Sequence, residues 1–327
     1  MGLAIIHSRA SVGVQAPNVT VEVHISNGMP GFTLVGLPET TVKESRDRVR
    51  SAIINSRFEF PAKRITVNLA PADLPKEGGR FDLPIALGIL AASEQIALTK
   101  LEGYEFIGEL ALSGELRSVK GVLPAALAAN RAKRCLVVPQ GNGDQAALVG
   151  KELHKSAQTL LEVCADLCGQ QTLSLFQTEP KPLHTKSLRN LQDIIGQQQG
   201  KRALEIAAAG NHNLLFLGPP GTGKTMLASR LCDLLPEMNE DEAMETASVA
   251  SLTQQEINQH NWKQRPFRSP HHSSSMAALV GGGSIPRPGE ISLAHNGLLF
   301  LDVSPKPKKQ GIYCQYEDVI FLFQSIK

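Results

Sequence analysis

Residues 218–225 have the residue types and the spacing that could do chemistry in this chain. They match the pattern G-x-x-x-x-G-K-[ST] and are, in order, Gly218, Pro219, Pro220, Gly221, Thr222, Gly223, Lys224 and Thr225. Glycines let the backbone turn with its amides facing inward, where they can hold phosphate oxygens. Lys224 would place a positive charge on the β and γ phosphates, and the Thr225 hydroxyl would bind Mg²⁺. The spacing therefore predicts a loop that binds ATP with Mg²⁺.

The segments on either side of this loop must position it. Residues 214–217 form a short apolar run that is typical of a buried strand. After the loop, leucines fall on one helical face, at Leu227, Leu231, Leu234 and Leu235. The alternative to phosphate binding is a glycine turn that only lets the strand pack against the helix. It is the weaker one, because Lys224 and Thr225 stand where phosphate binding needs them.

An acidic group is predicted beside the loop. Residues 298–301 form a second apolar run, and this run ends in Asp302. A buried strand that closes on Asp is the Walker B arrangement, which places a carboxylate beside Mg²⁺ at the end of a neighbouring strand. Thr225 and Asp302 are therefore the predicted Mg²⁺ ligands, with the metal held through the nucleotide.

Composition and charge describe an ordinary globular protein. The chain has 327 residues, 42% of them hydrophobic, and 33 Lys and Arg residues against 31 Asp and Glu give a net charge of +2. Such a small net charge does not indicate the basic surface that binds nucleic acid. The start lacks the features of a signal peptide, and no apolar run approaches the roughly 18 residues of a membrane span. A cytoplasmic protein without membrane contact is expected.

The cysteines and a histidine pair are candidate metal ligands. The five cysteines are odd in number and scattered, as expected for free thiols in a reducing compartment. Cys164 and Cys168 lie one helical turn apart, but no matching pair lies nearby, so core packing is favoured. His271 and His272 are adjacent, which points their side chains apart, so contact with substrate or a neighbouring subunit is favoured over zinc.

Periodicity divides the chain into two units. Residues 19–25 alternate as a half-buried strand does, Asn27-Gly28 predicts a turn at its end, and residues 82–93 form an apolar helix. Strands first pair locally and later alternate with helices, so residues 1–168 are expected to form an α/β or α+β domain. Residues 169–190, with two prolines and little apolar periodicity, are the expected linker to a second unit.

Long ordered motifs carry a resemblance to a known family. The chain is similar to the bacterial magnesium-chelatase-like AAA+ proteins of the ComM/YifB family over residues 1–302. The motifs that carry the resemblance lie at residues 21–53, 68–93, 193–225, 265–283 and 288–302. It implies a Lon-protease-like α/β domain of the ChlI type, residues 1–168, followed by an AAA+ P-loop NTPase domain that begins at residue 191.

The resemblance also implies activity and partners. Members of this family look like hexameric ATP-hydrolysing motors, and ComM acts as a DNA helicase in branch migration during natural transformation. On that pattern, residues 268–290 would hold an insertion that faces the hexamer pore, through which DNA would pass. The alternatives are a chelatase-type ATPase subunit that drives metal insertion, and a non-functional truncated product.

Two departures from the family pattern bear on chemistry. Arg80 stands where the Lon nucleophile Ser would be and Leu123 where its partner Lys would be, so a Ser-Lys peptidase is not expected. The N-terminal domain is instead expected to be an assembly or DNA-facing module. Val303 occupies the place of the Walker B Glu, which activates the attacking water in the family. Weak ATP binding with negligible turnover is therefore expected.

The resemblance stops at Asp302, so residues 191–302 are expected to be the first part of an incomplete AAA+ domain and residues 303–327 a non-family tail. In the family, a strand from later in the chain separates the strand before the phosphate loop from the Walker B strand. Residues 319–323, VIFLF, are the only tail segment that could take that position. Without such a strand, buried backbone groups on both sides would lack partners.

Overall fold

The chain forms two compact units. The computed structural model describes residues 2–12, 14–36, 44–76, 78–149, 154–173, 190–219, 221–253, 261–271, 273–283, 287–303 and 318–324. Unit 1 is Met1–Pro180 and unit 2 is Lys181–Lys327, so the division falls within residues 169–190. Within the described ranges, no helix is both long and apolar enough to cross a bilayer.

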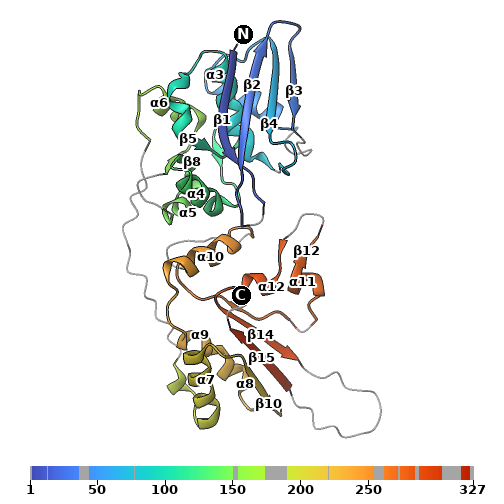
Figure 1. Cartoon of the computed structure of the whole chain (residues 1–327), viewed down its shortest axis with the longest axis vertical. Helices are drawn as coiled ribbons and strands as arrows, with labels where there is room; N and C mark the ends of the chain where they lie inside the picture. The colour runs from blue at the N-terminus through green and yellow to red at the C-terminus, as the bar shows by residue number, and fades with distance from the viewer. Residues whose placement is uncertain are drawn as a thin grey trace. The chain divides into compact units, whose positions relative to one another are not determined.

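A four-stranded sheet with the order β1-β2-β4-β3 forms one layer of unit 1 (Figure 1). Its strands are β1 (Gly2–Arg9), β2 (Asn18–Ser26), β3 (Gly31–Val35) and β4 (Arg64–Ala70). The apolar residues of β2 are buried alternately, as its period-2 pattern predicts. The chain does bend after β2, but β3 pairs in parallel with β4 and not with β2. The turn at Asn27-Gly28 therefore leads to a crossover rather than to a hairpin.

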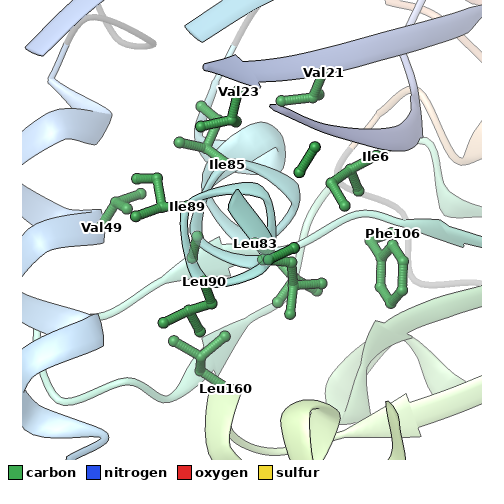
Figure 2. Packing of buried hydrophobic residues seen from close by; sticks show 14 of the residues in the cluster. Ile6, Val21, Val23, Val49, Leu83, Ile85, Ile89, Leu90, Phe106 and Leu160 are labelled. Carbon is green, nitrogen blue, oxygen red and sulfur yellow. The ribbon is translucent and has the colours of Figure 1, made fainter. Parts of the chain in front are cut away.

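The helix α3 (Asp82–Ala92) is the centre of the unit 1 core, and all eleven of its residues are buried. Figure 2 shows α3 with Val21 and Val23 of the sheet on one side and Leu160 on the opposite side. Packing is close, because a Cβ added at Gly88 would lie 2.5 Å from a methyl group of Val23. A helix that is apolar on every face needs partners all round, and here the sheet and other helices supply them.

The remaining strands of unit 1 form two smaller sheets, and further helices and 3-10 turns accompany them. A three-stranded parallel sheet has the order β5-β8-β9, and β6 and β7 form an antiparallel pair. The strands are β5 (Tyr104–Phe106), β6 (Glu109–Leu110), β7 (Leu116–Arg117), β8 (Cys135–Pro139) and β9 (Lys155–Ala157). The helices are α2 (Ser45–Asn55), α4 (Val122–Arg131), α5 (Gly143–Ala147) and α6 (Leu160–Leu167). Short 3-10 turns are η1 (Gly79–Phe81), η2 (Leu98–Gly103) and η3 (Gln140–Asn142).

The described cysteines are free thiols, as expected. Cys164 is buried in the unit 1 core, and this burial raises the pKa of its thiol to about 12. Cys168 is exposed, so the two side chains do not face one environment. Among the described residues, no group of three or more His, Cys, Asp and Glu side chains lies close enough together to hold a metal ion.

Unit 2 is built on a sheet with the order β10-β15-β14-β11 (Figure 1). Its strands are β10 (Leu214–Gly218), β11 (Phe267–Arg268), β14 (Leu298–Val303) and β15 (Asp318–Gln324). The tail strand β15 pairs antiparallel with β10 on one side and with β14 on the other. The prediction that residues 319–323 fill the gap between these two strands is confirmed.

Helices and a small hairpin complete unit 2. The helices are α7 (Gln198–Gly210), α8 (Lys224–Ser229), α9 (Leu231–Leu234), α10 (Glu240–Ala250), α11 (Met276–Val280) and α12 (Glu290–Leu293), with the 3-10 turn η4 (Leu191–Asp193) before them. The hairpin pairs β12 (Gly281–Gly282) with β13 (Arg287–Pro288). Ile194, Leu204, Leu227 and Leu298 belong to the core of this unit.

The prediction that Leu227, Leu231, Leu234 and Leu235 share one helix is wrong. The chain forms two short helices that break at Arg230, because the amide of Arg230 donates to the carbonyl of Leu227, three residues back. Leu227 and Leu231 are buried, as their shared face predicts. Leu235 lies outside the helix with an extended backbone, since the following Pro236 disfavours a helical conformation there.

We expect the amides of β15 to be strongly protected from hydrogen exchange, because a paired strand flanks β15 on each side. Ile320→Pro removes one N–H from the ladder and should destabilise unit 2 by about 1–3 kcal/mol. Hydrogen exchange with mass spectrometry of the whole chain measures both effects. The amides of unit 1, including those of β2, are the internal control and should not change. Exchange of residues 319–323 as fast as in an unfolded peptide would contradict the sheet order.

Candidate functional site

The loop after β10 has the backbone geometry of a phosphate-binding loop. β10 ends at Gly218, and α8 begins at Lys224. Gly221 and Gly223 both have a φ of 82°, the left-handed conformation that only glycine adopts without strain. Pro220, one of the predicted loop residues, lies outside the described residues. The glycines at these two positions are thus required by the turn itself.

The side chain of Lys224 lies across this loop. Its residue is 8% exposed, and its Nζ donates hydrogen bonds of 2.8 Å to the carbonyl oxygens of Gly218 and of Pro219. The Thr222 hydroxyl also donates to the Pro219 oxygen, at 3.0 Å. These bonds hold the ammonium group inside the loop, where phosphate oxygens could replace the carbonyls as acceptors. Thr225 is exposed in the first turn of α8, so its hydroxyl is accessible to a metal ion.

Gln197 supports the loop from outside the predicted motif. Its Nε2 donates a 3.0 Å hydrogen bond to the carbonyl oxygen of Thr222. The backbone of Gln197 is left-handed, with a φ of 53° and a ψ of 40°, just before α7 begins. A polar residue in a run of glutamines carries no spacing that predicts this contact. Only the tertiary structure brings residue 197 to residue 222.

Asp302 lies at the same edge of the sheet as the phosphate loop. β10 and β14 are both antiparallel to β15, so they run parallel to each other and their carboxyl ends meet at one edge. Across the sheet, Asp302 is in register with Ile320 of β15, which is in register with Phe216 of β10. Two strand spacings of about 4.8 Å separate β10 from β14. The tail strand thus brings the two predicted motifs to one edge of the sheet.

The carboxylate of Asp302 fits a role as a metal ligand. Its Oδ1 is buried and has no hydrogen-bond partner among the residues that the structure describes, although Asp302 is only partly buried as a residue. An ionised carboxylate can only accept hydrogen bonds or bind cations, and a buried one without either is costly. Mg²⁺ prefers oxygen ligands and keeps several waters. Asp302 and the Thr225 hydroxyl are therefore the residues that would hold Mg²⁺, with the nucleotide completing its coordination.

Val303 follows Asp302 at the end of β14. Its backbone is in register with Val319 of β15. A valine side chain has no group that accepts a proton, so this position cannot serve as a base for an attacking water.

The segment predicted to face a pore, residues 268–290, is closed at its base by an ion pair. The guanidinium of Arg268 donates two hydrogen bonds to the Glu290 carboxylate, at 2.7 and 2.8 Å. Between them lie α11 and the β12–β13 hairpin, and α11 exposes Met276 at 73% and Val280 at 57%. His271 lies 2.7 Å from the Ser273 hydroxyl, and His272 is outside the described residues.

A cavity of about 550 Å³ lies elsewhere in unit 2, between α10 and residues 261–268. Trp262, Arg265 and Phe267 are among its lining residues, and no residue of the phosphate loop is. Arg265 is engaged in the wall, because it donates to the carbonyl oxygens of Pro236 and Asn296, at 2.6 and 2.7 Å. Its lining therefore includes neither the phosphate loop nor Asp302.

In unit 1, the residues aligned with the Lon dyad are both buried. Arg80 lies in η1 with 5% of its surface exposed, and Leu123 lies in the first turn of α4 with none. The two segments do come together, because Nη1 of Arg80 is 3.8 Å from the point that a Cβ of Gly121 would occupy. Neither side chain supplies a nucleophile or a general base for a Ser-Lys mechanism.

Comparison with known families covers both units. The family described as "Magnesium chelatase, subunit ChlI" matches residues 190–314, and that described as "Subunit ChlI of Mg-chelatase" matches residues 21–142. The first match continues past Asp302 into the segment that we expected to lie outside the family.

Known proteins match most of the chain. It is 66% identical over 310 residues to the competence protein ComM of Haemophilus influenzae, which covers 94% of this chain and 61% of that protein. It is 61% identical over 314 residues to the protein YifB of Salmonella typhimurium, which covers 95% of this chain and 62% of that protein. The chain thus spans about three fifths of the length of these relatives.

A shorter match concerns the fold. Over 48 residues the chain is 42% identical to an archaeal Lon protease of Methanothermobacter thermautotrophicus, which covers 15% of this chain and 8% of that protein. With the ChlI matches, this similarity confirms the expected fold class of a Lon-like α/β domain followed by a P-loop domain. Because the matches extend over both units and include ComM and YifB at 66% and 61% identity, the chain belongs to the ComM/YifB family of magnesium-chelatase-like proteins.

Proposed function

We propose that unit 2 binds ATP together with Mg²⁺. The observation that carries this proposal is the loop geometry: Gly221 and Gly223 turn the backbone, and Lys224 Nζ lies inside the turn, 2.8 Å from two loop carbonyls. In this arrangement the loop amides would bind the phosphates and Lys224 would neutralise the β and γ oxygens. Family membership supports the same cofactors, since the matched families are magnesium chelatase subunits.

The proposed metal site uses one residue from the first turn of α8 and one from the end of β14. The Thr225 hydroxyl would bind Mg²⁺ directly from α8, and Asp302 would bind it from the end of β14. Held there, Mg²⁺ would supply positive charge to offset the charge of the phosphates. The unpartnered Oδ1 of Asp302 supports this role, because a cation would satisfy it.

The site is proposed to bind nucleotide better than it hydrolyses it. Lys224, Thr225 and Asp302 supply binding and charge, but Val303 offers no base for the attacking water. A missing catalytic carboxylate of this kind costs roughly two to four orders of magnitude in rate. We propose that the chain turns over ATP at a negligible rate and that no peptidase activity resides in unit 1.

For the complete proteins of the family, we propose an ATP-driven DNA motor. One support is the 66% identity to a protein named for competence. The other is the segment of residues 268–290, which exposes Met276 and Val280 and whose ends are joined by the Arg268–Glu290 ion pair. In this proposal six copies assemble in the cytoplasm, DNA passes through the ring, and branch migration is the outcome. The family description favours a second candidate, an ATPase subunit that drives metal insertion.

DNA-stimulated ATP hydrolysis distinguishes the two candidates. The assay uses a full-length relative that contains both units, with branched DNA, duplex DNA and no DNA as the three conditions. A DNA motor should hydrolyse ATP at least about tenfold faster with branched DNA than without DNA, because bound DNA is part of its active complex. An unchanged rate in all three conditions would contradict the DNA motor and leave the chelatase-type candidate.

Lys224→Ala should weaken ATP binding by at least about tenfold, because it removes the charge that lies inside the loop. Titration with a fluorescent ATP analogue measures the dissociation constant for this chain. Arg202→Ala is the matched control, since Arg202 is an exposed cation on α7 that pairs with Glu205 at 3.0 Å. If both variants bind as the unchanged chain does, unit 2 does not use this loop.

Asp302→Asn should raise the Mg²⁺ concentration needed for half-maximal ATP binding by about tenfold, because an amide oxygen is a weaker ligand than a carboxylate. Binding without Mg²⁺ should stay the same, which separates loss of a ligand from misfolding. The measurement is an ATP titration at a series of Mg²⁺ concentrations. An identical Mg²⁺ dependence in both proteins would remove Asp302 from the proposed site.

A further inference from the structure

Arg80 is a buried cation that no described group pairs with. The residue is 5% exposed, and both Nε and Nη2 of its guanidinium are buried without a hydrogen-bond partner. Burial lowers its pKa to about 10, so the side chain is still positively charged at pH 7. A buried charge without a partner is costly, and native proteins satisfy such groups with water or ions.

Nearby carboxylates are already engaged with other cations. Glu109 packs against Gly79, next to Arg80, but its ion pair is with Arg117, at 3.8 Å. Asp82 accepts a 2.8 Å hydrogen bond from Arg48 and another from the amide of Leu110. Neither carboxylate therefore pairs with the Arg80 guanidinium. The polar groups close to it are hydrogen-bond donors.

Those donors are the start of α4 and the Ser11 hydroxyl. A Cβ placed on Gly121 would lie 2.9 Å from Ser11 Oγ and 3.8 Å from Arg80 Nη1, so both polar atoms lie close to the N-cap residue that precedes this helix. Gly121 has a left-handed backbone, with a φ of 66°, and carries no side chain that could cap the helix. α4 continues for ten residues, long enough for its positive end to attract an anion.

Hydrogen-bond donors and positive charge thus gather at one point, and Ser11 is only half-buried, which leaves a route from solvent. We propose that Arg80, Ser11 and the first amides of α4 bind a small oxyanion, a phosphate or carboxylate group, at this point in unit 1. A guanidinium recognises such groups through paired N–H donors, and uncapped helix amides complete the shell. This site is independent of the nucleotide site proposed for unit 2.

The test titrates inorganic phosphate into the whole chain, with the phosphate loop of unit 2 silenced by Lys224→Ala. Amide NMR signals of Val122 and Leu123 should shift saturably, while sodium chloride at equal ionic strength should not shift them. In the same background, Arg80→Met should weaken phosphate binding at least about tenfold, since it removes the charge and all the N–H donors of the guanidinium. A parallel titration with acetate shows whether a carboxylate is the better ligand.

Thermal unfolding gives a second readout. Without phosphate, Arg80→Met should raise the melting temperature of unit 1, because a buried charge without a partner is removed. With phosphate, only the protein that retains Arg80 should gain further stability. If Arg80→Met does not fold, Ser11→Ala decides, and it should weaken binding at least about threefold. Shifts that do not saturate, or that persist unchanged in the variants, would overturn the proposal.

Discussion

The hydrogen bonds that β15 makes on both of its sides hold the candidate site of unit 2 together. β10 carries the phosphate loop at its end and β14 carries Asp302, and these two strands are not hydrogen-bonded neighbours in the sheet. Because β15 pairs with both, it fixes their register and brings Gly218 and Asp302 to one edge of the sheet. Every chemical role proposed for the two motifs depends on this one strand.

β15 runs in the opposite direction to both of its neighbours in the sheet. β15 follows β14, and it returns antiparallel to it. An antiparallel strand satisfies the same backbone donors and acceptors as a parallel one, so β10 and β14 remain parallel to each other. The carboxyl ends of strands are where open α/β sheets bind ligands, and this geometry is kept.

Unit 1 depends in the same way on α3, but through packing rather than through hydrogen bonds. Its eleven buried residues join the sheet on one side to α6 on the other, and its first residue, Asp82, is held by Arg48 at 2.8 Å. Burial raises the pKa of Asp82, and hydrogen bonds from Arg48 and Ser45 oppose that rise. Arg80 lies two residues earlier and has no such partner among the described residues. This difference is the reason that we place the proposed oxyanion site at Arg80 and not at Asp82.

The sequence by itself determined the elements whose patterns are local. The glycines and Lys224 identify the phosphate loop, alternation identifies β2, and the apolar run that ends in Asp302 identifies β14, because side-chain periodicity and turn residues act within a few positions. Tertiary structure decided the pairing of β3 with β4, the break at Arg230, the contact of Gln197 with Thr222, and the meeting of Arg80 with Gly121. The contacts among these join residues that are far apart in the sequence. The spacing of residues along the chain therefore does not predict them, nor does it predict which buried polar group lacks a partner.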